Sequence, residues 1–402
     1  MKNILLILPY GGVGGMERLA LNFYSCYKDK GYNVKALKFF GLESDIINFN
    51  EDELILSNKD LYAFNKLERI KFYLLTPIKI RRIIKTHNIT HSISFGDLTN
   101  IFSALTYTNE KKIGSIHALK SVELSNNSIF SKLTRLSYKT SYRKFDKMVS
   151  ISHAIKKDLI ENCGYKFESN LKVIYNPHDT KTILELGQRQ IEDNEEKLIF
   201  NKNVIVFLGR MSVQKSPWHL INAFSLLKEK KDVNLVFIGD GDKQVINIIS
   251  KMIKHYSIED SVYFMGRKSN PYKYLSKAKT LVLTSHYEGT PNVIIEAIAL
   301  NIPVVSSNCT NGIAELMSLN HSEVISSNQN IEVESGIITP NVYKGIIGIP
   351  ENTLNISEEE RKVADALFEV INNENHKISV SKNSKKLTKK FDVDYVCDSY
   401  LE

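Results

Sequence analysis

The sequence predicts an α/β protein with two facing, Rossmann-like domains, each built on a doubly wound parallel sheet. Short apolar runs alternate with helical patterns through both halves of the chain, which is typical of βαβ units. At 402 residues the chain is too long for a single hydrophobic core. Because open parallel sheets bind ligands at the carboxyl ends of their strands, we expect a site in a cleft between the domains.

Apolar runs bounded by polar residues or glycines mark the expected strands. In the first half they are 4–8, 34–39, 91–95, 112–116, 147–151 and 172–175. In the second half they are 204–208, 234–238, 262–264, 281–284 and 304–306. A polar, acidic stretch at 190–197 separates the two sets, so we place the boundary between 180 and 200. Residues 328–355 are interpreted as a loop-rich insertion, and 385–402 as a terminal helix anchored by Phe391, Tyr395 and Val396.

Composition favours an intracellular globular protein. Hydrophobic residues make up 43% of the chain and charged residues 24%, which is ordinary for a soluble protein. The four cysteines are far apart and form no C-x-x-C pair, which argues against a zinc site or a disulfide framework and favours a reducing cytosol. The apolar run at 4–8 is too short for a signal peptide or a membrane span, so we interpret it as a strand.

The net charge of +8 is concentrated in the first half of the chain. Residues 1–180 hold 27 Lys and Arg against 17 Asp and Glu, whereas the rest holds 26 against 28. A basic first domain indicates an anionic surface or substrate on that side, and an anionic membrane leaflet or a lipid diphosphate is favoured. The alternatives are a solvated lysine-rich surface and nucleic acid, for which we find no motif.

Two carboxylates near residue 290 carry most of the functional signal. Glu288 lies in the turn after an expected buried strand, and Glu296 is the one charged residue of the apolar helix that follows. Thr290 is the expected N-cap of this helix and Pro291 its first residue. Its N-terminus offers N–H groups to an anion, and the carboxylates can accept hydrogen bonds from sugar hydroxyls. This pattern predicts a nucleotide-sugar pocket; the alternative is a Glu296 paired with an internal Arg or Lys.

Two cations follow another expected strand, because Arg210 and Lys215 come directly after 204–208. From there both side chains can turn toward the cleft and hold a diphosphate, Arg210 by its planar fork and Lys215 as a point charge. Their expected role is to stabilise the charge of a departing nucleoside diphosphate. The alternative for each is a surface cation without a ligand.

A glycine-rich segment at 11–18, with Gly14 and Gly15 at its centre, follows the first strand. Its backbone can approach a phosphate or a sugar closely, although a tight turn explains it equally well. It has neither the GxGxxG spacing nor the Walker lysine, which argues against a dinucleotide or NTPase site.

Two other polar positions follow strands. Asp240 and Asp242 resemble a metal site, but no further ligand completes a cation shell, so we expect no metal there. His117 follows a strand that ends at residue 116 and can reach a substrate hydroxyl, although a lone histidine is often structural.

Together these features resemble glycosyltransferase family 4, the retaining enzymes of GT-B fold that include bacterial sugar transferases of surface-glycan assembly. Residues 288–296 are similar to the family's E-x7-E motif, and 209–215 to its diphosphate-binding Gly-Arg…Lys segment. Residues 11–18 are similar to its N-terminal glycine-rich loop. The chain departs from the family pattern at Ala314, where Arg is usual, and 317–355 is longer than usual.

The resemblance implies an acceptor-binding domain at 1–180, a nucleotide-sugar-binding domain at 181–384, and a terminal helix, 385–402, that returns to the first domain. It implies that Glu288 contacts the donor sugar, Glu296 the ribose diol, and Arg210 and Lys215 the diphosphate. The backbone near the donor would come from Gly14, Gly15, Gly289, Thr290, Pro291 and Asn292, with Arg267 beside the base and His117 beside the sugar. No metal or other cofactor is implied.

The expected reaction is transfer of a hexose or N-acetylhexosamine from a nucleotide sugar, UDP-linked rather than GDP-linked, to a lipid-linked glycan of lipopolysaccharide, O-antigen or capsule. No carboxylate is an evident nucleophile, so the resemblance implies front-side attack with retention. We expect a cytoplasmic protein, peripherally associated with the inner face of the plasma membrane. The alternatives are an inactive GT-B scaffold, against which the four intact site residues argue, and a nucleotide-sugar epimerase, whose acid/base carboxylates we do not find.

Overall fold

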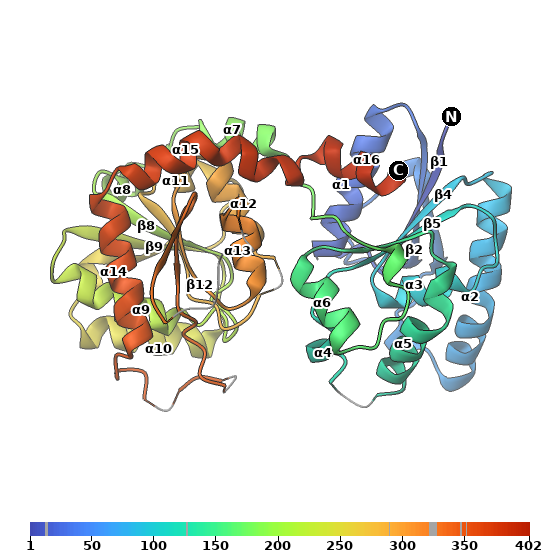
Figure 1. Cartoon of the computed structure of the whole chain (residues 1–402), viewed down its shortest axis with the longest axis horizontal. Helices are drawn as coiled ribbons and strands as arrows, with labels where there is room; N and C mark the ends of the chain where they lie inside the picture. Colours follow the sequence, from blue (N-terminus) through green and yellow to red (C-terminus); the bar gives the residue numbers. More distant parts are fainter. Residues whose placement is uncertain (13–14, 126–127, 289, 321–327, 346–347, 351) are drawn as a thin grey trace. The chain divides into compact units, whose positions relative to one another are not determined.

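The computed structural model describes residues 1–402 apart from 13–14, 126–127, 289, 321–327, 346–347 and 351. The chain forms two compact units. Unit 1 joins Met1–Pro177 with Lys390–Glu402, and unit 2 is His178–Lys389. Each unit holds a parallel sheet with helices packed on it (Figure 1), which confirms the predicted two-domain α/β architecture.

Unit 1 is built on a parallel sheet with strand order β3-β2-β1-β4-β5-β6-β7. Its strands are β1 (Asn3–Leu8), β2 (Asn33–Phe40), β3 (Glu53–Ser57), β4 (His91–Phe95), β5 (Lys111–Ile116), β6 (Lys147–Ser150) and β7 (Leu171–Val173). Its helices are α1 (Gly15–Asp29), α2 (Lys66–Thr86), α3 (Asp97–Ala104), α4 (Lys120–Glu123), α5 (Ile129–Lys139), α6 (His153–Glu161) and α16 (Val393–Leu401). The sequence prediction missed β3, whose residues are mostly half-buried and whose apolar run is only three residues long.

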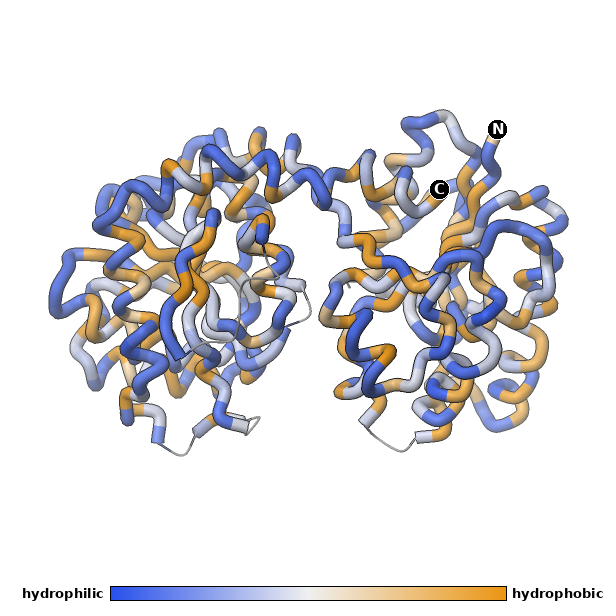
Figure 2. Tube along the Cα trace, viewed as in Figure 1, coloured by the Kyte–Doolittle hydropathy of each residue, from blue (hydrophilic) through white to orange (hydrophobic). Residues whose placement is uncertain are grey.

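Both faces of the unit 1 sheet are covered. Leu6 of β1 packs in a cluster with α1 and α16, whereas its neighbours Leu5 and Ile7 pack in a second cluster with α2. Successive side chains of a strand point to opposite faces, so an all-apolar strand such as β1 requires a helix layer on each side. Figure 2 shows the strands of each unit as apolar segments between more polar helix and loop surfaces.

The segment after Lys390 completes unit 1. In α16, Val396, Cys397 and Tyr400 are buried against α1, and the Tyr27 hydroxyl donates a 3.0 Å hydrogen bond to the Cys397 carbonyl oxygen. The predicted anchor Phe391 is buried against the ring of Tyr175. The predicted anchor Tyr395 is instead half exposed.

Unit 2 has the strand order β10-β9-β8-β11-β12-β14-β13. Its strands are β8 (Asn203–Leu208), β9 (Val233–Ile238), β10 (Val262–Phe264), β11 (Thr280–Leu283), β12 (Val304–Ser307), β13 (Ile331–Val333) and β14 (Gly336–Thr339). Its helices are α7 (Thr180–Gly187), α8 (Asn194–Phe200), α9 (Pro217–Lys228), α10 (Lys243–His255), α11 (Tyr272–Leu275), α12 (Asn292–Ala299), α13 (Asn311–Met317), α14 (Glu358–Asn372) and α15 (Asn375–Thr388).

Residues 328–355, interpreted as a loop-rich insertion, contain two short strands that the sequence analysis did not predict. β14 lies in this segment as a buried strand parallel to β12, and β13 pairs with it in an antiparallel hairpin. Each strand is so short that its sequence carries too few positions for a period to be recognised.

The chain passes between the units at Pro177 and His178, three residues before the predicted end of the first domain. The polar stretch at 190–197 therefore lies inside unit 2, where it forms the start of α8. The chain returns to unit 1 at Lys390, later than the predicted 385, because α15 continues to Thr388 within unit 2.

Candidate active site

The loops after β8, β9 and β10 are held together at the carboxyl edge of the unit 2 sheet. The Gly209 amide donates to the Ile238 carbonyl at 2.9 Å, and the Gly239 amide donates to the Gly266 carbonyl at 2.9 Å. Gly239 has a φ of 141°, and a Cβ at this position would lie 2.2 Å from the Gly209 carbonyl oxygen. Only glycine therefore allows these two loops to approach so closely.

Lys215 and Glu288 meet at this edge. The Lys215 Nζ lies 2.5 Å from the Glu288 Oε1, and their side chains are 18% and 9% exposed. The Ser285 hydroxyl donates to the same Oε1 at 2.8 Å, and the Gln214 Nε2 lies 3.5 Å from Oε2. Because β8 and β11 are neighbours in the sheet, two residues more than seventy positions apart in sequence form one charged pair.

Hydrogen bonds to backbone carbonyl groups fix the two loops that carry this pair. The Ser216 hydroxyl donates to the Thr284 carbonyl at 2.6 Å, and the His286 amide donates to the Gln214 carbonyl at 2.8 Å. From the next strand, the Ser307 hydroxyl donates to the Ser285 carbonyl at 2.9 Å. Ser216 adopts a φ of 38°, a left-handed conformation that turns the chain directly into Pro217 at the start of α9. The pair is therefore preorganised by the sheet edge rather than by flexible side chains alone.

Arg210 does not join the Lys215 and Glu288 pair. Its Nη2 lies 2.5 Å from the Asp242 Oδ1, and its side chain is 71% exposed. The spacing of Arg210 and Lys215 suggested that both side chains turn toward one ligand. In the structure, Arg210 instead pairs with Asp242 from the loop after β9. The Asp242 carboxylate therefore has the Arg210 guanidinium as its ion-pair partner.

The helix that follows Glu288 begins later than predicted. Thr290 is not its N-cap; Pro291 precedes the helix, with an extended ψ of 107°, and α12 begins at Asn292. Asn292, the first residue of α12, is exposed, whereas Pro291 and Ile294 on either side of this turn are buried. Glu296 is partly exposed, whereas its neighbours Ile295 and Ala297 are buried.

Other predicted positions lie at the same edge or outside the described residues. Arg267 follows Gly266 after β10 and is exposed. Gly14 and Gly289 lie outside the described residues, and Gly15 is the first residue of α1.

In unit 1, His117 follows β5 at the carboxyl edge of that sheet. Its Nε2 lies 2.8 Å from the Ser115 hydroxyl oxygen, and its ring lies 6.3 Å from that of Phe95. Burial and, to a lesser degree, the charge of Lys120 lower the pKa of His117 to about 3. The imidazole is therefore neutral near pH 7 and suited to a hydrogen bond with a hydroxyl.

Comparison with known proteins follows the same division of the chain. Residues 13–182 match the family described as Glycosyltransferase Family 4, and residues 188–338 match Glycosyl transferases group 1. The chain belongs to glycosyltransferase family 4. It is an enzyme that transfers sugars, as the sequence predicted.

Individual relatives resemble this glycosyltransferase over nearly its whole length. It is 26% identical over 395 residues to an uncharacterized glycosyltransferase of Methanocaldococcus jannaschii, covering 93% of each chain. It is 25% identical over 405 residues to an alpha-1,4-N-acetyl-D-galactosaminyltransferase of Campylobacter jejuni named for the acceptor GalNAc-alpha-(1->4)-GalNAc-alpha-(1->3)-diNAcBac-PP-undecaprenol, covering 100% of this chain and 98% of the relative. HepE of Anabaena, crystallised with UDP, has a TM-score of 0.72 at 16% identity and covers 100% of this chain and 98% of its own. That likeness supports the GT-B fold.

Sequence reasoning missed several side chains around the pair in this glycosyltransferase. Ser285 and Gln214 contact Glu288 directly, and Cys309, in the loop after β12, lies close enough to feel its charge. Burial, and then the Glu288 carboxylate, raise the pKa of the Cys309 thiol to about 12. The available signal for Ser285 was its position directly after a buried strand; nothing in the sequence marked Gln214 or Cys309.

A buried chain of polar groups supports the loop that carries Glu288. The His219 Nδ1 lies 2.8 Å from the Glu360 Oε1, and its Nε2 lies 3.1 Å from the Nε2 of His286. Burial and the neighbouring His219 lower the pKa of His286 to about 4. Glu360, at the start of α14, thus steadies a loop of the site through two imidazole rings.

We expect the glycosyltransferase to lose stability as the pH falls from 6.5 toward about 4. Burial lowers the pKa of His117 to about 3 and those of His178 and His286 to about 4. In that window the unfolded imidazoles bind protons that the folded ones do not, so protonation favours unfolding. His178 and His286, which are both buried, should each lower the free energy of unfolding by about 1–2 kcal/mol at pH 5 relative to pH 7. Urea unfolding at both values measures this, and His178→Gln should make the loss smaller; an unchanged loss would contradict the assignment.

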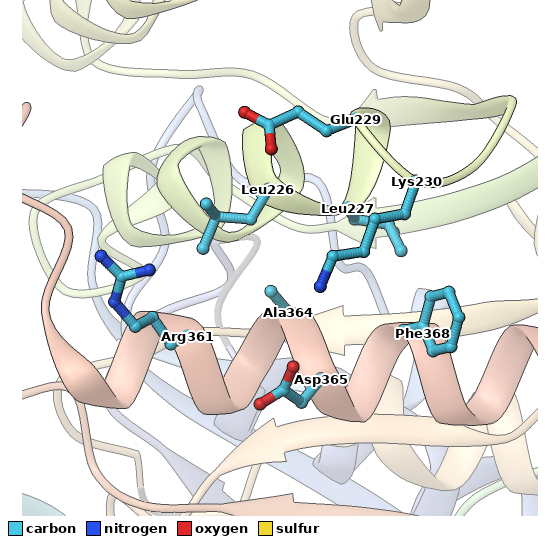
Figure 3. Close-up of a pocket in the computed structure, with 8 residues that line it drawn as sticks. All are labelled: Leu226, Leu227, Glu229, Lys230, Arg361, Ala364, Asp365 and Phe368. Carbon is cyan, nitrogen blue, oxygen red and sulfur yellow. The ribbon is translucent and has the colours of Figure 1, made fainter.

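A separate pocket lies away from these residues, between the end of α9 and the helix α14 (Figure 3). Its volume is about 300 Å³, and Leu226, Ala364 and Phe368 line it together with charged side chains such as Arg361. None of the predicted site residues of this glycosyltransferase contributes to it.

Proposed function

We propose that this glycosyltransferase transfers a hexose or N-acetylhexosamine, with retention, from a UDP-sugar to a lipid-linked glycan of a bacterial surface polysaccharide. The observation that carries the proposal is the ion pair of the largely buried Lys215 and the buried Glu288 at the carboxyl edge of the unit 2 sheet. An ammonium group has three donors, so Lys215 can hold Glu288 and a phosphate oxygen together. Glu288 is then held beside the phosphate to which the donor sugar is attached.

The reaction needs positioning and charge stabilisation more than a strong base. Lys215 stabilises the negative charge of the departing diphosphate, and the exposed Arg210 can exchange Asp242 for a phosphate oxygen. Glu288 already contacts Lys215 and Ser285, which favours a role in holding sugar hydroxyls rather than attacking the anomeric carbon. Front-side attack, with the diphosphate oxygen taking the acceptor proton, fits this arrangement without a metal or another cofactor.

Two relatives support the choice of substrates. HepE was crystallised with UDP, which favours a uridine donor over the alternative GDP-sugar. The Campylobacter relative is named for an acceptor linked to undecaprenol by a diphosphate. An acceptor with such a long isoprenoid chain stays in a membrane, so the enzyme must reach the membrane surface.

A panel of UDP-sugars and GDP-sugars tests this function. The purified protein is incubated with each donor and a synthetic polyprenyl-diphosphate-linked glycan, and nucleotide release and the anomeric configuration of the product are measured. Acceptor-dependent release of UDP with a retained linkage is expected. Absence of both turnover and saturable nucleotide binding would favour an inactive scaffold, and an epimerised donor would favour an epimerase.

Two helices of unit 1 have the composition of a membrane-binding surface. α2 exposes Leu67, Ile70, Leu74 and Ile78 at helical spacing, and α5 likewise exposes Ile129, Leu133 and Leu136. Both helices pack on α3. Exposed cations accompany these apolar side chains: Lys66, Arg69, Lys71, Lys79, Arg81, Arg82, Lys85, Lys132 and Lys139. Apolar groups flanked by cations bind the interface of an anionic leaflet.

None of the described helices combines the length and the apolarity required to cross a membrane. Association through α2 and α5 would place the enzyme at the inner face of the plasma membrane, where the acceptor is accessible.

We expect Leu74→Glu combined with Leu133→Glu to lower binding to anionic vesicles by about 10-fold or more, because each change removes apolar burial and adds repulsion. Co-sedimentation with phosphatidylglycerol vesicles measures the effect. Leu198→Glu on α8 of unit 2, where the leucine is 68% exposed, is the matched control and should bind normally. Equal losses in both variants, or wild-type binding that ignores anionic lipid content, would contradict this surface.

A further inference from the structure

Three potential metal ligands from three elements of unit 2 lie together outside the donor site. Glu332 comes from the edge strand β13, Glu369 from the last turns of α14, and His376 from the first turn of α15. One ligand atom from each lies within 4.8 Å of the others. This cluster could not be recognised from sequence, because Glu332 and Glu369 are thirty-seven positions apart and the strand between them was not predicted.

His376 is buried, with 5% of its surface exposed, and is the unusual member of the cluster. Within the described chain its Nε2 has no hydrogen-bond partner. The nearest carboxylate oxygen, Oε1 of Glu369, lies 3.7 Å away, which is too far for a hydrogen bond. A buried imidazole nitrogen that faces a carboxylate without bonding to it requires another partner.

Local structure holds the three ligands in place. α14 ends at Asn372 and α15 begins at Asn375, so the sharp corner between them brings Glu369 and His376 to the same side. The Asn373 Nδ2 donates to the Glu369 Oε1 at 2.8 Å and orients that carboxylate. The Ser379 hydroxyl donates to the Glu334 carbonyl at 3.0 Å and fixes α15 against the hairpin that carries Glu332.

The charge of the cluster is not neutralised by neighbouring cations. Among the described ion pairs, Glu332 has no partner, and Glu369 has only the distant His376. The nearby Lys279 is engaged at 3.0 Å by Glu374, a different carboxylate. The two carboxylates therefore present negative charge to a cation.

We propose that Glu332, Glu369 and His376 form a binding site for a divalent transition-metal ion, with Zn²⁺ as the ion that fits best. One imidazole nitrogen and two carboxylate oxygens are a donor set that zinc accepts, with water in the fourth position. Ligand atoms around a tetrahedral zinc lie about 3.4 Å apart. The exposed Glu332 and the half-exposed Glu369 can close the remaining gap by side-chain rotation, while the buried His376 stays fixed.

A metal here would cross-link β13, α14 and α15. The ion would bind the folded state and not the dispersed ligands of the unfolded chain, so it would stabilise unit 2 in proportion to its concentration. This role is separate from sugar transfer, because none of the three residues contacts the Lys215 and Glu288 pair.

Zinc titration of chelator-treated, tag-free protein tests the site, with a chromogenic chelator as competitor. One Zn²⁺ per chain is expected, together with a rise in the unfolding temperature followed by fluorescence of Trp218, the single tryptophan. Glu332→Gln and Glu369→Gln should each weaken zinc binding by more than about 10-fold, since even partners of metal ligands matter that much. His376→Ala should abolish binding.

Glu374→Gln is the matched control, because that carboxylate lies beside the cluster and outside it. It should bind zinc like the unaltered protein. Co²⁺ substitution separates this site from the cysteines: a visible d–d band without a thiolate charge-transfer band is expected. Binding that survives Glu332→Gln and Glu369→Gln, or a cobalt spectrum with thiolate character, would overturn the proposal. Because Glu332 is exposed, we expect the Glu332→Gln protein to fold normally.

Discussion

Lys215→Ala is expected to lower kcat/KM for sugar transfer by about 10²–10³-fold, the usual cost of losing a charge stabiliser at a reacting centre. Its Nζ is the one ammonium shown to contact Glu288 among the described ion pairs, so no neighbouring lysine there can replace it. Steady-state kinetics with the preferred donor measure the loss. Lys243→Ala, at the exposed start of α10, is the control and should leave the rate unchanged.

Glu288→Gln should produce a similar loss, and the double variant should lose little more than either single one, because the two residues act as a unit. The Glu288 side chain is only 9% exposed, so the thermal stability of each variant must be compared with that of the unaltered protein. Additive losses in the double variant would indicate that the residues act independently and would count against the proposed arrangement.

Gly239→Ala is expected to destabilise unit 2 by about 3 kcal/mol or more. The φ of 141° is accessible almost only to glycine, and the added Cβ would overlap the Gly209 carbonyl oxygen at 2.2 Å. For a unit of this size the unfolding temperature should fall by about 10 °C. Trp218 is buried in α9 of unit 2, so its fluorescence reports this transition separately from unit 1.

Gly348→Ala is the comparison for this experiment. A Cβ at Gly348 meets nothing within 4 Å, and its φ is not in the region that favours glycine. The substitution should therefore be close to neutral. A Gly239→Ala protein as stable as Gly348→Ala would show that the β8 and β9 loops can separate without cost.

The core of each sheet and the Lys215 and Glu288 positions could be predicted from sequence because each rests on a local pattern. β8 is a continuous apolar run from 204 to 208, and β9 is apolar apart from Asn234; each is followed by a glycine. This pattern indicates both the strand and the loop at its carboxyl end. The polar residues that follow such strands were correctly placed at the sheet edge.

Partners and short strands could not be predicted, because they depend on contacts between distant segments. The sequence around Arg210 does not reveal that Asp242 of the β9 loop will pair with it. β14 becomes a strand because β12 offers it a parallel partner, and its four residues carry no recognisable period. The one-residue error at Thr290 and Pro291 arises because a proline with extended ψ precedes the helix as readily as it begins one.

The division of unit 1 into two stretches of sequence has a consequence for biosynthesis. Residues Met1–Pro177 leave the ribosome well before Lys390–Glu402, and all of unit 2 is translated in the interval. Until α16 is synthesised, Phe23 and Tyr27 of α1 lack the apolar side chains of α16 that pack with them in the folded unit. The first domain therefore keeps an apolar surface accessible to chaperones for as long as the whole of unit 2 is being translated.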